Sequence, residues 1–364
     1  MKNTITLKIQ KLKQPIGELY ISKINAYDLF LMSESDIIKL SKNKDSYDGI
    51  QREIKSQKVD YIKDYLTSVD ATMPNSIILN ITKDKIISLT EDEITIKTSK
   101  DTFSIIDGQH RLKGFENSKN TFFELSITFF IDLPKEEQSR VFVTINSEQT
   151  KVDPSISFYQ ERKEKYFTPR KMVADLSVMF AKDLDSPWKN KIKLIGKKDE
   201  LSEDAMISLS AFAQRILQYI YNDKKYFNKL RNKLIKNENN LSVLEREESF
   251  GGSIFWNFYI SHDELSLYKI LLNYFNVLKD VFKYDWNDTN SLLTKTTGYN
   301  ALMTLFKDLF EEGLNQGTLD KTYFYNKLAA LKELDTTINS KNYGASGGQA
   351  SSQLYKVLKE KINV

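Results

Sequence analysis

The sequence predicts an α+β protein in which a mixed α/β domain, residues 1–153, precedes an all-helical domain, residues 154–364. Short β-rich segments alternate with helical patterns in the first part of the chain. After Pro154, apolar residues recur almost throughout at the spacing of amphipathic helices. A chain of 364 residues is also long enough for about two domains, each with its own core.

In the first domain, apolar residues three and four positions apart predict a helix over 54–69. A second helix is expected at 109–117, directly after the turn Asp107-Gly108. Pro134, followed by two glutamates, marks the start of a third at 135–145. Strands are expected at 4–12, 17–21, 76–81, 85–89, 93–97, 102–106 and 122–132.

The second domain is predicted to consist of helices with aromatic and aliphatic faces. The segments with this spacing are 168–182, 204–222, 264–284, 299–312 and 320–334. Asn237 to Asn240 is expected to be a linker. Ser346 to Ser352 is rich in glycine and serine, which predicts a flexible loop before a short last helix.

Composition excludes several kinds of site. Without cysteine the chain has no disulfide, thiol nucleophile, iron–sulfur cluster or cysteine-based zinc site. The two histidines, His110 and His262, exclude a histidine-rich metal site; a carboxylate site for a hard cation stays open, but no spacing indicates one. We therefore predict no metal site. The lack of cysteine, of a signal-peptide pattern and of a long apolar window leads us to expect a cytoplasmic protein without a membrane partner.

The stretch from Asp107 to Arg111, Asp-Gly-Gln-His-Arg, is the most informative part of the chain. A helix that starts after a β-rich run presents free backbone N–H groups, which bind anions. Gly108 lets backbone approach a ligand, Arg111 adds a guanidinium suited to phosphate, and His110 adds a titratable donor. Asp107, His110 and Arg111 are the candidate catalytic residues. The alternative is a capped helix whose polar start faces water.

A second polar block follows the expected helix 135–145 and offers amides and a charge that could contact a base or ribose. It could equally be an ordinary helix-ending turn. Arg52, near the start of helix 54–69, could also reach an anion. The candidate nucleotide-binding residues are Gly108, Gln109, His110, Arg111, Arg52, Asn146, Gln149 and Lys151.

Net charge is only +4, too small to identify a nucleic-acid-binding protein by itself. One region nevertheless interleaves tyrosines and a phenylalanine, from Tyr219 to Phe227, with basic residues. Such a mixture is typical of a nucleic-acid surface, where bases stack on aromatic rings. It also fits an amphipathic helix with a solvated lysine face. The candidate DNA-binding residues are Lys224, Lys225, Lys229, Arg231 and Lys233.

These motifs resemble the DGQHR-domain family, which includes the DndB proteins associated with DNA phosphorothioate modification. Further blocks that resemble the family are Gln51-Arg52-Glu53, Val59 to Leu66, Pro74 to Leu79, Phe142 to Val152 and Lys295 to Gly298. The resemblance covers most of the chain and is strongest over residues 50–155.

The turn is also similar to the phosphate-binding turn of the ParB and sulfiredoxin superfamily. That similarity implies a ParB/sulfiredoxin-like fold for the first domain and a nucleotide at the turn. Position 109 holds Gln109 where sulfiredoxin has its cysteine, so peroxiredoxin repair is excluded. No segment matches the helix-turn-helix of ParB.

Together these resemblances imply a DNA-binding regulator or accessory protein of a DNA-modification system. It would bind ATP or another NTP, with or without Mg²⁺, and its partners would be DNA, DNA-modification proteins and further copies of itself. Two alternatives stay open. One is a ParB-like NTPase or nuclease in defence against foreign DNA, and the other is a non-enzymatic protein-interaction module.

Overall fold

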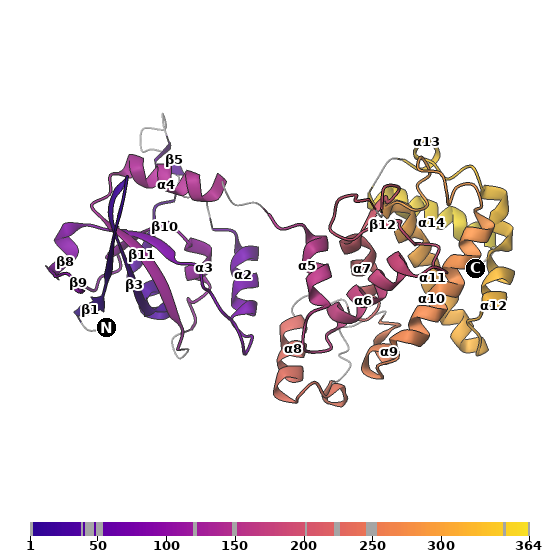
Figure 1. Cartoon of the computed structure of the whole chain (residues 1–364), viewed down its shortest axis with the longest axis horizontal. Helices are drawn as coiled ribbons and strands as arrows, with labels where there is room; N and C mark the ends of the chain where they lie inside the picture. Colours follow the sequence, from indigo (N-terminus) through magenta and orange to yellow (C-terminus); the bar gives the residue numbers. More distant parts are fainter. Residues whose placement is uncertain are drawn as a thin grey trace. The chain divides into compact units, whose positions relative to one another are not determined.

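The computed structural model describes residues 3–37, 39–40, 47–48, 54–118, 122–147, 151–200, 202–221, 226–244, 253–344 and 347–362. The chain separates into two compact units, Met1–Lys151 and Val152–Val364 (Figure 1). Strands and helices mix in the first unit, whereas helices dominate the second. The predicted fold class, a mixed α/β part followed by a helical part, is confirmed.

The first unit is built on a six-stranded mixed sheet with the order β2-β3-β11-β7-β10-β4. Its strands are β2 (Gln10–Gln14), β3 (Gly17–Asn25), β4 (Ser33–Ser35), β7 (Ile77–Ile81), β10 (Phe103–Asp107) and β11 (Glu124–Ile131). β11 runs antiparallel to β3 and parallel to β7, and β10 runs antiparallel to β7. This order places the end of β10, where the sequence motif begins, beside the start of β7.

A smaller antiparallel sheet joins β1 (Thr4–Lys8), β9 (Glu93–Lys97) and β8 (Ile86–Leu89) in the order β1-β9-β8. β5 (Lys39–Leu40) and β6 (Tyr47–Asp48) form a two-stranded pair. The helices of this unit are α1 (Ala26–Leu31), α2 (Ser56–Tyr65), η1 (Lys83–Lys85), α3 (Gln109–Lys113) and α4 (Lys135–Ser147). Its core consists of alternate strand residues such as Leu79, Phe103 and Phe129, which are fully buried.

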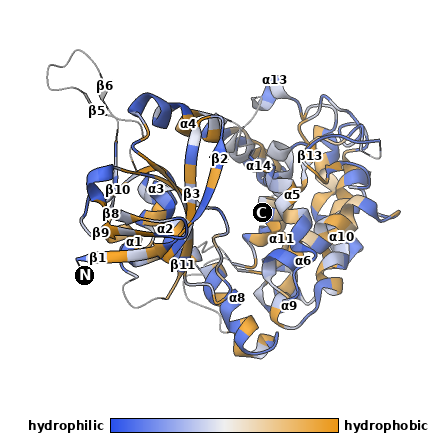
Figure 2. Cartoon of the chain, turned by 60° about the vertical axis from the view of Figure 1, so that its left-hand side comes forward, coloured by the Kyte–Doolittle hydropathy of each residue, from blue (hydrophilic) through white to orange (hydrophobic). Residues whose placement is uncertain are grey.

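The second unit is held by a cluster of buried aromatic rings. The Trp188 ring meets those of Phe212, Phe275, Trp286 and Tyr299 edge to face, with centroids 5.2–5.4 Å apart. Its elements are α5 (Pro154–Glu161), α6 (Pro169–Lys182), β12 (Ile192–Lys193), β13 (Ile207–Ser208), α7 (Leu209–Leu217), α8 (Tyr226–Lys236), η2 (Leu241–Val243), α9 (Trp256–Ile260), α10 (Glu264–Val281), α11 (Thr296–Gln316), α12 (Lys321–Leu328), η3 (Ala329–Leu334), α13 (Ser340–Tyr343) and α14 (Gly348–Ile362). Hydrophobic and hydrophilic residues alternate along α6 and α10, as expected of amphipathic helices (Figure 2).

Two sequence-based predictions in this unit are wrong. The loop expected up to Ser352 is helical from Gly348 onward, because α14 buries Ala350 and Leu354 and packs against α11. The helix expected from residue 204 begins only at Leu209. Ser208 closes a short strand there and caps the helix by accepting a hydrogen bond from the backbone N–H of Ala211 at 3.2 Å.

Candidate functional site

The turn between β10 and α3 requires glycine. Gly108 has φ 102°, in the left-handed region that side chains rarely adopt. A Cβ at this position would also lie 2.6 Å from the Cδ1 atom of Ile77 in β7. The backbone of the motif can therefore pack against β7 only without a side chain at position 108.

Arg111 links this turn by hydrogen bonds to the chain segment before β7. Its Nη1 donates to the carbonyl oxygen of Asn75 at 2.6 Å, and its Nη2 donates to that of Ser76 at 3.1 Å. The same Nη2 pairs with the Asp107 carboxylate at 2.8 Å, and both side chains are largely buried. The guanidinium therefore contacts protein groups on two sides, and a bound phosphate would have to share it with them.

His110 joins the motif to the start of α2. Its Nε2 accepts a hydrogen bond from the backbone N–H of Lys55 at 3.1 Å. Burial lowers the pKa of His110, and the nearby charge of Lys58 lowers it further against the opposing effect of Asp107. The ring is therefore neutral at neutral pH, with its proton on Nδ1 so that Nε2 can accept.

A cleft of about 470 Å³, here called the motif cleft, opens beside the turn. α2, which contacts α3 (Figure 1), contributes one wall, and the last two turns of α4 contribute another. The lining residues are Lys58, Ile62, Asn75, Asp107, Gly108, Gln109, His110, Arg111, Phe142 and Asn146. Within the described chain Lys58 forms no ion pair, so its ammonium group is available to a ligand.

The structure brings most of the predicted nucleotide-binding residues together. The whole motif and Asn146 line the motif cleft, whereas Lys151 is described but does not. The Asn146 amide donates to the carbonyl of Phe142 at 2.8 Å. Arg52 and Gln149 lie outside the described residues.

Sequence reasoning missed Lys58 and Phe142 as parts of the site. Lys58 and Ile62 are four residues apart, so they share one face of α2, and both line the cleft. That spacing was readable from the sequence. The direction of the face was not, because it depends on how α2 packs against α3.

The predicted basic surface of the second unit is only partly available. Lys229 is exposed and Lys233 is half-buried on α8, one turn apart, while Lys224 and Lys225 lie outside the described residues. Arg231 instead forms an ion pair with Glu164 at 3.2 Å, with both side chains largely buried. Arg231 therefore has a structural role, whereas the exposed Lys229 ammonium lies over the Tyr226 ring, 5.2 Å from its centroid.

Three of the four aromatic residues of this region are not available for stacking, and the fourth, Phe227, is half-buried against the helical core. Tyr219, Tyr221 and Tyr226 are buried in the helical core. The structure thus agrees with the alternative interpretation, an amphipathic helix with lysines on its solvent face.

The comparison with known families decides the assignment. The family model described as "DndB: DNA-sulfur modification-associated" matches residues 10–346. The chain belongs to the DndB family. The match confirms the resemblance predicted from the motif, and it places this DndB-family chain among proteins associated with DNA sulfur modification.

Other comparisons add little to this. No curated protein matches the chain. Among solved structures, the C-terminally truncated chromosome-partitioning protein ParB from Caulobacter crescentus, complexed with CTP-gamma-S, matches at 9% identity and a TM-score of 0.27. The match covers 65% of this chain and 98% of the ParB chain. A superposition this loose carries no argument about fold or ligand.

The described residues contain neither a membrane-crossing helix nor a cluster of metal-ligating side chains. None of the described helices combines the length and apolar character needed to cross a membrane. The described side chains also contain no group of three or more histidines and carboxylates that could hold a metal ion.

Proposed function

We propose that this DndB-family protein is a DNA-binding regulator or accessory protein of a DNA-modification system that binds a nucleotide in the motif cleft. One observation carries the nucleotide part of the proposal. The turn held by Gly108, the Lys58 ammonium, which forms no ion pair with the described residues, and the amides of Asn75 and Asn146 converge on a single cleft.

The chemistry of the motif cleft suits a nucleoside triphosphate. Lys58 supplies a positive charge for phosphate, and Gly108 allows close approach of backbone N–H groups. The two asparagine amides offer donors and acceptors for a base or ribose, and Phe142 offers an apolar wall. A volume of about 470 Å³ lies within the range of small-molecule sites.

A thermal-shift panel with ATP, CTP and GTP, each with and without Mg²⁺, tests the nucleotide part. We expect at least one nucleotide to raise the melting temperature of the wild-type protein. Lys58→Ala should weaken its binding about tenfold, because a charge-assisted contact is lost. Lys8→Ala, which removes an exposed lysine of β1 that does not line the cleft, is the matched control. If no nucleotide shifts the melting temperature, the nucleotide part of the proposal is wrong.

DNA binding through α8 is tested by charge reversal at Lys229 and Lys233. We expect the double glutamate variant to lose most of its affinity, and the wild-type affinity to fall steeply with salt, because lysine contacts to phosphate release counterions. Arg231→Ala should instead destabilise the second unit, since it leaves Glu164 unpaired. DNA affinity that is insensitive to salt and to both lysines would contradict the assignment of this surface.

Measuring nucleotide hydrolysis distinguishes an accessory NTPase from a protein that only binds the nucleotide. Asp107 pairs with Arg111, and the His110 Nε2 accepts a backbone hydrogen bond. These contacts support a positioning role for both residues over a catalytic one. Phosphate release in the presence of DNA measures the difference: sustained release that His110→Asn abolishes would favour the enzymatic alternative.

A further inference from the structure

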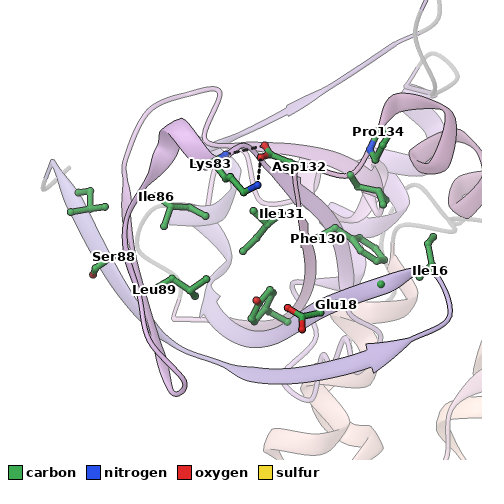
Figure 3. Close-up of a pocket in the computed structure, with 14 residues that line it drawn as sticks. Ile16, Glu18, Lys83, Ile86, Ser88, Leu89, Phe130, Ile131, Asp132 and Pro134 are labelled. Carbon is green, nitrogen blue, oxygen red and sulfur yellow. Dashed lines mark hydrogen bonds and ion pairs between the residues drawn. The ribbon is translucent and has the colours of Figure 1, made fainter.

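A second cleft, of about 620 Å³, lies at the free edge of β8 and is here called the edge cleft (Figure 3). All four residues of β8, from Ile86 to Leu89, line it. Successive side chains of a strand point to opposite faces of its sheet. A cleft that touches four residues in a row therefore faces the edge of the strand. In the described chain β9 is the neighbour of β8 on one side, and the edge cleft lies on the other.

β8 lacks charge and proline, two of the features that usually protect an edge strand, although it has only four residues and its pairing with β9 shifts register between Ile86 and Ser88. Charged residues, proline and short length keep exposed edges from pairing with other chains. The edge strand β2 of the larger sheet carries Lys11 and Lys13, and the opposite edge strand β4 has only three residues. The sequence of β8, Ile-Ile-Ser-Leu, has neither charge nor proline. The side chains of Ile87 and Leu89 are 52% and 43% exposed.

The edge cleft is apolar in its middle and charged at its ends. Ile86, Ile131 and Phe130 lie in its middle (Figure 3). At one end the Lys83 ammonium pairs with Asp132 at 3.4 Å. Glu18 lies at the end opposite this pair, between Leu89 and Ile16 in the view (Figure 3).

The end near Leu89 is the more acidic one. The turn that follows β8 adds Glu91 and Asp92, both exposed, to the carboxylate of Glu18. The Glu18 carboxylate is paired with Lys11 at 2.7 Å. Lys13 of β2 also lies opposite Glu18, so three carboxylates face two lysines where β8 ends, and the small excess of negative charge attracts a cationic group entering there.

We propose that the edge cleft binds an extended peptide segment of a partner protein, which adds to β8 as an antiparallel strand. Antiparallel pairing is the more stable arrangement per residue. It puts the N-terminal side of the segment beside Glu18 and Glu91. The matching segment has basic residues followed by alternating apolar residues that fill the cleft while its backbone pairs with β8.

A second copy of this chain fits less well than a single strand. β8 of another copy carries β9 on its far side, and two strands need about 4.8 Å more width than one. The cleft lies between β8 and the end of the β2–β3 hairpin, with the end of β11 forming its floor. An isolated strand needs no such width.

The probe is a fluorescent synthetic peptide, Lys-Lys-Val-Thr-Val-Ile. Its binding to the full-length chain is measured by fluorescence anisotropy. We expect saturable binding that Ile87→Lys weakens at least about tenfold, since the side chain at the cleft becomes charged. Val69→Lys, at an exposed apolar residue that does not line the cleft, should leave binding unchanged. Methylating the peptide nitrogens that face β8 should weaken binding about tenfold as well, because backbone hydrogen bonds are lost.

Charge reversal gives an independent measurement. Glu18→Lys should reduce affinity for the basic peptide and raise affinity for a variant that begins with two glutamates. Equal binding of methylated and unmethylated peptides, or no binding of the basic peptide, would overturn the proposal. Light scattering tests whether a second copy of the chain binds at this edge instead. A dimer that Ile87→Lys dissociates would assign the edge to a second copy and would also overturn the peptide proposal.

Discussion

Replacing Arg111 by alanine is the sharpest test of how the motif works. The sequence suggests that Arg111 contacts a ligand phosphate. In the structure its guanidinium donates to the carbonyl groups of Asn75 and Ser76 and pairs with Asp107. Because these groups belong to the protein, the substitution should lower the stability of the first unit even without a ligand.

The expected magnitude follows from these three contacts. A hydrogen bond to a charged group contributes about 1.5–3 kcal/mol, and the Arg111 side chain is 24% exposed, so water replaces part of what is lost. We expect a loss of about 2–4 kcal/mol in the free energy of unfolding, non-additively over the three contacts. At about 3 °C per kcal/mol this corresponds to a fall of about 6–12 °C in melting temperature.

Differential scanning calorimetry of the ligand-free protein measures this loss. Arg111→Lys should fall between wild type and alanine, because a single ammonium cannot reach both carbonyls and the carboxylate. Arg140→Ala is the control, since Arg140 is exposed and pairs only with Glu137 among the described residues, and it should cost less than about 0.5 kcal/mol. An unchanged melting temperature of Arg111→Ala together with a tenfold weaker nucleotide affinity would refute this reasoning and make Arg111 a ligand contact.

The motif supports two further predictions. Gly108→Ala should cost about 1–3 kcal/mol through strain and the clash with Ile77, and more than Gly17→Ala, which has a similar φ in open space; chemical denaturation of both variants measures the difference. Because the pKa of His110 is lowered in the folded protein, the unfolded chain takes up its proton first, so stability should decrease as the pH falls below about 6.5. His110→Asn should show a shallower decrease in melting temperature over that range, and a parallel decrease would exclude His110 as the cause.

Local patterns in the sequence predict several strands of the first unit closely, but the strand expected at 4–12 is two strands, β1 and β2, in different sheets, and α1 is not predicted. β9 occupies the predicted residues 93–97, β7 begins one residue later than predicted, and β10 is displaced by one residue, because turn residues bound these strands on both sides. The order of the strands is not local information. β11 inserts between β3 and β7, and nothing in its own sequence indicates those neighbours. At Gly348 to Ser352 the local composition is misleading. It predicts a loop, but the segment is helical because α14 buries one face against the rest of the unit.

In the candidate site, too, local sequence patterns identify residues but not their tertiary contacts. The sequence identifies the motif residues because they are consecutive and follow a strand. It does not reveal which groups the Arg111 guanidinium contacts, since the accepting carbonyls belong to Asn75 and Ser76, 36 and 35 positions earlier in the chain. Lys58 enters the site only through the packing of α2 against α3. Contacts that depend on tertiary structure therefore redefine the roles of residues that the sequence selects.

The aromatic cluster of the second unit has a practical consequence for spectroscopy. All three tryptophans, Trp188, Trp256 and Trp286, belong to the second unit and are buried there. Tryptophan emission therefore reports the unfolding of the helical unit and is blind to the unit that carries the motif. A melt recorded by emission and by calorimetry on the same sample distinguishes the two units. A substitution in the motif should leave the emission curve in place while shifting the heat absorbed by the first unit.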